Sequence, residues 1–252
     1  MLGAAAAAAQ AVPNRTTAYL HPTDVTDARA IWVNPAGLAG ITSASVYLDL
    51  TVGQPGARGQ LRQLSLGFDS RGLAFSYQRD VLDGGRRGHT YKTGLAGGKG
   101  PLAAGFAVAL YRGDTKGTGL DMGLTYRPSE LLVVGGAIQN VGEPSVRGVK
   151  LPVTFVPGVS FQPFGPRAAL SAHARVTTDA VQGYAIGARA GFGLVEALLR
   201  LDTDRAFRRT DFAIGIAIGG PDRLGAVATT PGDVSTLDAI NLYGVSLRSF
   251  RR

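Results

Sequence analysis

The stretch GFAVALYRGDTKGTGLDMGLTYRP, residues 105–128, decides the fold class. In its first half, large apolar side chains occupy every second position and small ones stand between them. After a polar turn, large residues from Leu120 to Tyr126 alternate with small or charged ones from Asp121 to Arg127. A period of two residues is that of a β-strand, because successive side chains point to opposite faces. The stretch therefore predicts two strands joined by a short turn.

The same unit recurs from Ser45 onward, in runs closed by Gly, Pro, Asp or Arg. The apolar register of these runs carries no charged side chain, for example around Ile186 and Ile214. A lysine or arginine facing lipid at mid-bilayer would cost about 2 to 4 kcal/mol, so an uncharged register is what a lipid-facing surface requires. We predict an all-β fold, an antiparallel transmembrane β-barrel of about 14 strands with a short N-terminal helical plug. A soluble β-sandwich, which also alternates, is the alternative.

The opposite register carries small residues and charges of both signs, which is typical of a wet or plugged lumen. His173 and Arg175 fall on one predicted strand and Arg189 on the next, so these charges are expected to cluster. The cluster is either a mutually paired network that fills the lumen or a site for an anion or ligand. The candidate lumen residues are Asp121, Arg127, His173, Arg175, Arg189, Arg200 and Asp202.

Six tyrosines fall mostly near the ends of the predicted strands: Tyr47, Tyr77, Tyr91, Tyr111, Tyr126 and Tyr243. Outer-membrane barrels carry girdles of aromatic residues at both membrane interfaces. We therefore expect these tyrosines to face outward at the two ends of the barrel.

Composition excludes several functions. The net charge of +8 comes from basic residues scattered along the 252-residue chain, which argues against a nucleic-acid partner. The absence of cysteine excludes thiol redox chemistry and cysteine-based metal sites. His21, His89 and His173 lack the spacing of a zinc motif, and no nucleophile elbow is present. We expect no catalytic residue, no metal and no cofactor.

The N-terminal region divides into two predicted parts ahead of a barrel at residues 44–252. Residues 1–11 resemble the end of a secretory signal, and a frayed alanine-rich tail is the alternative. Residues 12–43 are predicted to form the plug, with a candidate helix over residues 23–32. In the plug, Asn34 can cap a helical turn, Pro35 fits its first position, and Gly37 permits a tight exit.

A family resemblance enters on this last segment. VNPAGLAG, residues 33–40, resembles the N-terminal signature of outer-membrane barrels of the FadL-like superfamily, including the PorV-like branch associated with type IX secretion. GGAIQNVGEP, residues 135–144, and LPVTFVPGVSFQP, residues 151–163, are similar to patterns of that branch. The resemblance implies fourteen strands, a hatch folded into the barrel and the outer membrane of a Gram-negative-type bacterium. It assigns the plug hinge to Asn34, Pro35, Ala36, Gly37 and Leu38, beside Trp32 as a packing anchor.

The resemblance also implies two functions. Some members pass hydrophobic compounds through the barrel, and others bind partner proteins. Pro157 removes a donor from its strand, and a strand kink in FadL-like barrels can make a lateral exit. We hypothesise a side opening at Pro157 and Gly158, with a plain bulge as the alternative. The expected partners are outer-membrane lipid and either a hydrophobic small molecule or lipid, for a transport barrel, or a protein, for a plugged docking platform.

Overall fold

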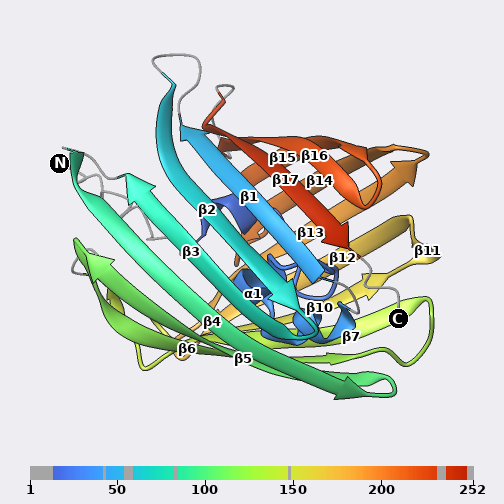
Figure 1. Cartoon of the computed structure of the whole chain (residues 1–252), viewed down its shortest axis with the longest axis horizontal. Helices are drawn as coiled ribbons and strands as arrows, with labels where there is room; N and C mark the ends of the chain where they lie inside the picture. The colour runs from blue at the N-terminus through green and yellow to red at the C-terminus, as the bar shows by residue number, and fades with distance from the viewer. Residues whose placement is uncertain are drawn as a thin grey trace.

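Fourteen long strands close into an antiparallel barrel in the computed structural model (Figure 1). The structure describes residues 14–41, 44–53, 59–81, 85–146, 149–231 and 237–248. The predicted signal remnant, residues 1–11, lies outside the described residues. The long strands are β1 (Ala44–Gly53), β2 (Gln60–Ser70), β3 (Leu73–Val81), β4 (Arg87–Lys99), β5 (Leu102–Gly113), β6 (Thr115–Tyr126), β7 (Leu132–Val141), β10 (Thr154–Phe161), β12 (Ala168–Thr177), β13 (Val181–Phe192), β14 (Val195–Asp204), β15 (Arg209–Gly219), β16 (Asp222–Pro231) and β17 (Ala239–Arg248).

The long strands pair with their neighbours in chain order, and β1 closes the ring against β17. Three short strands, β8 (Ser145–Val146), β9 (Val149–Lys150) and β11 (Pro163–Pro166), lie in the connections. The closed antiparallel barrel of 14 strands confirms the predicted fold class. No helix within the described ranges is long and apolar enough to cross a membrane.

Alternation gives the barrel an apolar outer face. On β1, Val46 and Leu48 are each 50% exposed, whereas Asp49, the next residue of the strand, is fully buried and faces the lumen. On β15, Ile214, Ile216 and Ile218 are likewise exposed. Large apolar side chains face outward in this way on strands all around the ring. Such a continuous belt of exposed apolar side chains is unfavourable in water and is suited to the hydrocarbon of a bilayer.

The connections differ between the two ends of the barrel. At one end the turns are tight, as at Arg71–Gly72, where both residues have positive φ (54° and 87°), the backbone of a two-residue hairpin turn. At the other end the connections are longer, above all residues 142–153 between β7 and β10. We name these the short-turn end and the long-loop end. Outer-membrane barrels have short turns on the periplasmic side and longer loops outside.

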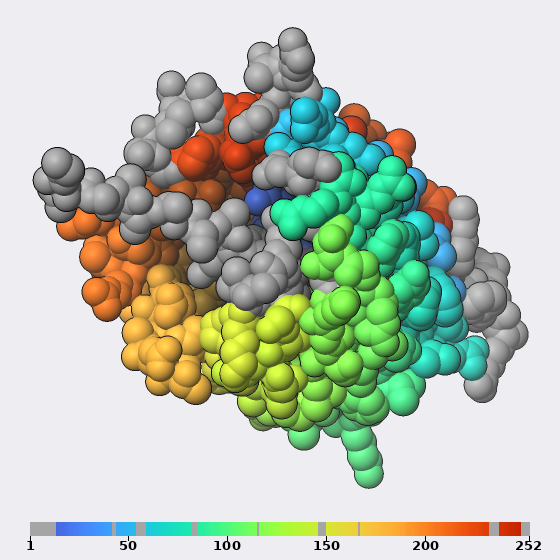
Figure 2. Space-filling view, turned by 90° about the vertical axis from the view of Figure 1, so that its left-hand side faces the viewer, coloured from blue at the N-terminus to red at the C-terminus, as the bar shows by residue number. Residues whose placement is uncertain are grey.

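Residues 14–41 lie inside the barrel and form the plug. The plug contains two 3-10 turns, Arg15–Thr17 and Pro35–Gly40, and one helix, α1 (Ala30–Val33). Its Ile31 and Leu38 are completely buried and form a core with small inward residues of the wall, such as Ala74 and Ala107. In Figure 2 the strands follow one another around the rim in chain order, and part of the N-terminal segment is visible within the ring.

Candidate functional site

The Asn34-Pro35 turn of the plug rests on two glycines of the wall, Gly105 of β5 and Gly123 of β6. A Cβ atom on Gly123 would lie 1.9 Å from the Asn34 side-chain oxygen, and one on Gly105 would lie 2.6 Å from the Pro35 carbonyl oxygen. We call this pair the glycine seat. The Asn34 oxygen caps the turn by accepting from the Ala36 N–H at 3.1 Å, as its sequence predicts.

The Asn34 amide group also ties the turn to its surroundings. Its Nδ2 donates to the Pro22 carbonyl at 2.8 Å and to Thr125 Oγ1 of β6 at 3.2 Å. Gln139 of β7 donates to the carbonyl of Val33 at 3.1 Å from the other side. The predicted hinge residues therefore lie in the contact between plug and wall.

Trp32 is buried against β1, β3 and β4. Its indole N–H donates to Tyr47 Oη at 2.6 Å and Ser76 Oγ at 2.8 Å. The Lys92 ammonium lies 5.0 Å from the ring centroid and pairs with Asp121 of β6. Trp32 thus fixes the plug by packing and by a hydrogen bond.

The tyrosine girdle prediction is wrong for three of the six residues, whereas Tyr91 and Tyr126 are exposed at 41% and 47%. Tyr47, Tyr111 and Tyr243 are buried inside the barrel at 4%, 4% and 7% exposure. Tyr47 accepts from Trp32, and the Tyr243 ring lies 4.5 Å from the Arg29 guanidinium. A tyrosine whose hydroxyl has polar partners is stable when buried in the lumen as well as at a membrane interface. Its position near a strand end does not distinguish these two environments.

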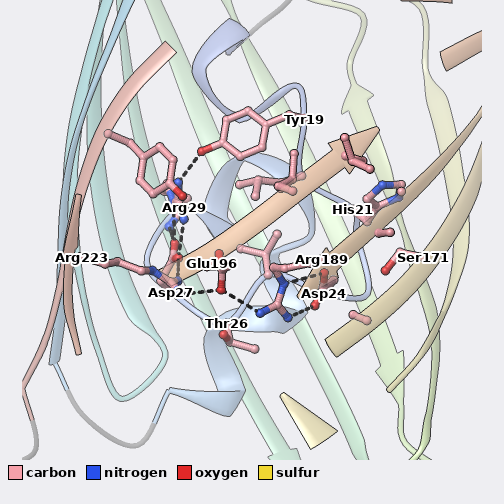
Figure 3. Close-up of a pocket in the computed structure, with 18 residues that line it drawn as sticks. Tyr19, His21, Asp24, Thr26, Asp27, Arg29, Ser171, Arg189, Glu196 and Arg223 are labelled. Carbon is pink, nitrogen blue, oxygen red and sulfur yellow. Dashed lines mark hydrogen bonds and ion pairs between the residues drawn. The ribbon is translucent and has the colours of Figure 1, made fainter. Parts of the chain in front are cut away.

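An ion network joins the plug to the wall near the short-turn end (Figure 3). It consists of three acids and three arginines, and each acid lies between arginines or beside one. Asp27 forms a two-point contact with Arg29 at 2.7 and 2.9 Å and accepts from Arg223 of β16 at 2.9 Å. Its members are Asp24, Asp27, Arg29, Arg189, Glu196 and Arg223.

Asp27 and Arg29 are buried and the other four members are partly buried, so the charges of the network depend on one another. Arg189 of β13 pairs with plug residue Asp24 at 2.5 Å and with Glu196 of β14 at 3.2 Å. Burial alone would raise the pKa of Asp27, but the guanidinium groups of Arg29 and Arg223 outweigh it and hold that pKa well below its ordinary value. Asp27 therefore stays ionised through the neutral and mildly acidic range.

A second charged group lies on the neighbouring wall. Arg200 of β14 donates to the plug carbonyl of Leu20 at 2.8 Å and pairs with Asp202 at 2.6 Å. Arg175 of β12 approaches Asp202 less closely, at 3.8 Å. His173 of β12 contacts plug residue His21 through their Nδ1 atoms, 3.0 Å apart.

The structure brings together six of the seven candidate lumen residues, within two regions. Asp121 lies beside Trp32, and His173, Arg175, Arg189, Arg200 and Asp202 lie along β12, β13 and β14. Arg127 stands apart, since it follows the end of β6, is exposed and donates to Gln162.

The plug's own charges were missed as site residues from the sequence. Asp24 and Asp27 were expected near the start of a helix over residues 23–32, but only Ala30–Val33 is helical. The two carboxylates bind arginines of the wall instead, and these ion pairs hold the residues before Ala30 in a non-helical conformation. The available signal was a group of charges, Asp24 to Arg29, within an otherwise apolar and small-residue segment. Within the described residues, no group of three or more His, Asp or Glu is arranged to hold a metal ion.

A cavity of about 550 Å³ occupies the lumen on the long-loop side of the plug. We call it the vestibule. Leu20, Trp32 and Val33 of the plug contribute to its floor, and Val156 and Tyr184 contribute to its wall. Its charged lining residues are Lys92, Asp121, Lys150, Arg175, Asp179, Asp202 and Asp211. Its volume is in the range of sites that enclose a small organic molecule.

The wall of the vestibule has an interruption at Val156-Pro157. The β10–β12 pairing covers Thr154 and Phe155 and resumes at Gly158, so two residues of β10 have no partner on β12. Pro157 has no N–H to donate, which explains why the ladder breaks there. Val156 is buried and lines the vestibule.

On its other side, β10 packs closely against β7. β7 places Gly135 and Gly136 opposite Gly158 and Pro157. A Cβ on Gly136 would lie 2.6 Å from the Val156 carbonyl oxygen, so β7 and β10 approach closely where β10 and β12 do not pair. Inside the barrel, plug residue Pro22 covers Gly158, since its Cγ lies 2.9 Å from the position of an added Cβ.

Comparisons with known proteins find this fold among solved structures. No family model and no curated protein matches the chain. It is similar to the toluene transporter TbuX of Ralstonia pickettii, with a TM-score of 0.63 and 13% identity over 92% of this chain and 98% of that one. The toluene transporter TodX of Pseudomonas putida gives 0.58 and 11%, covering 93% and 97%. The outer membrane protein Omp33 of Acinetobacter baumannii gives 0.55 and 10%, covering 83% and 99%.

At these identities the comparisons show the fold alone. The PorV-like branch of the expected resemblance stays a prediction. The expected fold is confirmed, a barrel of 14 antiparallel strands with an N-terminal segment inside it, and TbuX and TodX have similar folds.

Proposed function

We propose that this protein is an outer-membrane channel that takes small hydrophobic molecules into the vestibule and releases them sideways through the wall at Pro157-Gly158. The observation that carries the proposal is the interruption of the β10–β12 pairing beside Val156, where the vestibule meets the strand wall. A gap between two strands at this level would deliver an apolar molecule to the hydrocarbon without crossing water.

The plug supports a sideways path over an axial one. It is bonded to β6 through Asn34, to β13 through Asp24 and to β14 through the Leu20 carbonyl. A molecule leaving the vestibule toward the short-turn end would have to break these contacts together. At Val156-Pro157 two residues of β10 have no partner on β12, so fewer inter-strand hydrogen bonds hold the wall there.

The solved structures with similar folds support a small hydrophobic molecule as the transported substrate. Two of the solved structures with similar folds are toluene transporters. The vestibule has apolar surface from Leu20, Val33 and Val156 for such a molecule. Its location is the outer membrane, because the exposed apolar belt requires a bilayer and the similar barrels include an outer membrane protein.

A second function follows from the charged lining of the vestibule. Lys92, Asp121, Arg175 and Asp202 all contribute to it, and a purely apolar cargo would gain nothing from them. A plugged platform that docks a protein partner at the long-loop end makes use of such polar surface.

The test is uptake of a hydrophobic dye into liposomes that contain the intact protein. Val156→Trp places a bulky side chain at the inner side of the gap. Its matched control, Val159→Trp, makes the same change three residues later, where the side chain is 40% exposed on the outer face. Transport predicts dye uptake by the wild type and by Val159→Trp, and loss of uptake in Val156→Trp. Absence of uptake by the wild type would favour the docking platform, and equal uptake by both variants would exclude a path past Val156.

A further inference from the structure

His21 and His173 form a contact between the plug and the barrel wall that the transport path does not use. His21 belongs to the plug and His173 to β12, and both are buried, at 5% and 7% exposure. Their Nδ1 atoms lie 3.0 Å apart and their rings meet edge to face. The His21 ring lies over Gly187 of β13, where an added Cβ would be 2.3 Å from its Nε2.

The geometry of this contact allows only one proton between the two facing nitrogens. A neutral imidazole has one N–H and one bare nitrogen, so one Nδ1 donates and the other accepts. His21 Nε2 has no hydrogen-bond partner within the described residues. We assign His21 as the Nδ1–H donor, because its Nε2 is then a bare acceptor instead of a buried, unpaired N–H. When both rings are protonated, two N–H groups face each other at 3.0 Å, and the hydrogen bond cannot form.

The charged groups around the pair do not compensate a positive charge. Arg200 of β14 and Arg175 of β12 are the cations whose charge acts on His21. Asp202 of β14 is already paired with Arg200, and plug residue Asp24 with Arg189 of β13. No carboxylate of the described chain is hydrogen-bonded to either ring. Burial first, and then the Arg200 and Arg175 guanidinium groups, hold the pKa of His21 well below its ordinary value.

We propose that the His21–His173 contact is an acid-sensitive latch: protonation of both imidazoles releases the plug at His21 from β12 and opens the lumen to small ions. The Asn34-Pro35 turn stays on the glycine seat, because its bonds to the wall, from Asn34 to Thr125 and from Gln139 to the Val33 carbonyl, involve no titrating group. The latch is closed at neutral pH and loses its hold as the pH falls below about 6.5, the ordinary value for a solvent-exposed histidine.

The size of the response follows from proton linkage. A histidine that is neutral in the closed state and free to titrate in the open state shifts the ratio of open to closed by up to tenfold for each pH unit below about 6.5. Two histidines together shift it by up to about a hundredfold for each unit. A wild-type barrel should therefore conduct at least about tenfold more often at pH 4.5 than at pH 7.

The experiment measures the open probability of the full chain in planar bilayers between pH 7 and 4.5. Glutamine keeps a hydrogen-bonding amide without titrating, so the double variant His21→Gln with His173→Gln should change by less than about twofold. The third histidine supplies the control: His89 lies on β4, hydrogen-bonded to Tyr77, and His89→Gln should respond like the wild type. The emission of Trp32, the single tryptophan, should stay constant, because its part of the plug remains seated.

Each other result would overturn the latch. A wild type that stays closed at pH 4.5 has no acid-sensitive element. A double variant that still opens with acid responds through carboxylates instead. If the double variant is already open at pH 7, the single variants decide, because each must retain about half of the wild-type slope against pH. A full slope in a single variant, or a shift of Trp32 emission in acid, contradicts a local histidine latch.

Discussion

A single methyl group on the glycine seat should loosen the plug. In Gly123→Ala, the new Cβ would lie 1.9 Å from the Asn34 side-chain oxygen and 2.9 Å from the backbone nitrogen of Ala36. Both distances are below any ordinary contact, and the second involves backbone, so a rotation of Asn34 alone cannot relieve the overlap. The Asn34-Pro35 turn must lift from β6.

The magnitude follows from the bonds that the turn would lose. Asn34 donates to Thr125 of β6 at 3.2 Å, and Gln139 of β7 donates to the Val33 carbonyl at 3.1 Å. Each such bond contributes about 1 kcal/mol net, so displacement should weaken the seated state by about 2 kcal/mol. At about 1.4 kcal/mol for each factor of ten, the ratio of displaced to seated plug rises by about 30-fold.

The assay combines Trp32 fluorescence with ion conductance in bilayers. Trp32 lies two residues before Asn34 and is buried, so a displaced turn should shift its emission to longer wavelength. Ion conductance should rise, while the heat-dependent migration of the folded barrel on a gel remains. Gly97→Ala is the matched control, because an added Cβ at Gly97 of β4 meets nothing within 4 Å. The glycine seat would be refuted if Gly123→Ala matched Gly97→Ala in both measurements.

Three further predictions concern charge. Arg189→Ala leaves the partly buried carboxylate of Asp24 without its partner and should lower barrel stability by about 1 to 3 kcal/mol. Lys150→Ala breaks an exposed pair and should change stability by less than about 1 kcal/mol. Thermal unfolding in detergent, followed by gel migration, compares the two variants, and equal losses would contradict a role of Arg189 in holding Asp24. Leu48→Arg puts a charge on the lipid face and should weaken folding into liposomes by about 2 to 4 kcal/mol, and undiminished folding would argue against that face meeting lipid. Asp27→Asn should destabilise the barrel at pH 7, and because the pKa of Asp27 is depressed in the folded state, the difference from wild type should shrink as the pH falls below about 4; a constant difference down to pH 3 would contradict the ion pairs of Asp27.

The barrel was predictable because alternate residues of each strand face two different environments, lipid and lumen. Charged side chains are unfavourable in lipid, so the lipid-facing positions are uncharged, as at Ile214, Ile216 and Ile218. The plug turn was predictable for a similar local reason, since the cap of Asn34 and the position of Pro35 depend on the few residues around them.

Contacts between segments far apart in the chain gave no such local pattern in the sequence. Nothing local to Gly123 indicates that a plug residue 89 positions earlier needs the space of its missing side chain. Asp24 gains its role only from Arg189, and His21 only from His173, which lie on strands far along the chain. Tyr47 illustrates the same limit, because its place near a strand end fitted a membrane girdle as well as it fitted the lumen. A register predicts which way a side chain points, but the partner it meets depends on how the ring closes.

The seam between β1 and β17 is the place where the ring closes. The plug precedes β1 in the chain, yet it is bonded to strands as late as β16, through Arg223 and Asp27. The seam joins the first strand to the last along ten residue pairs, from Ala44 with Arg248 to Gly53 with Ala239. Trp32 of the plug binds β1 through Tyr47, so the plug has partners on both sides of the seam. Its full set of wall contacts therefore exists only once β17 has paired with β1, and the plug in turn ties the two sides of the seam together.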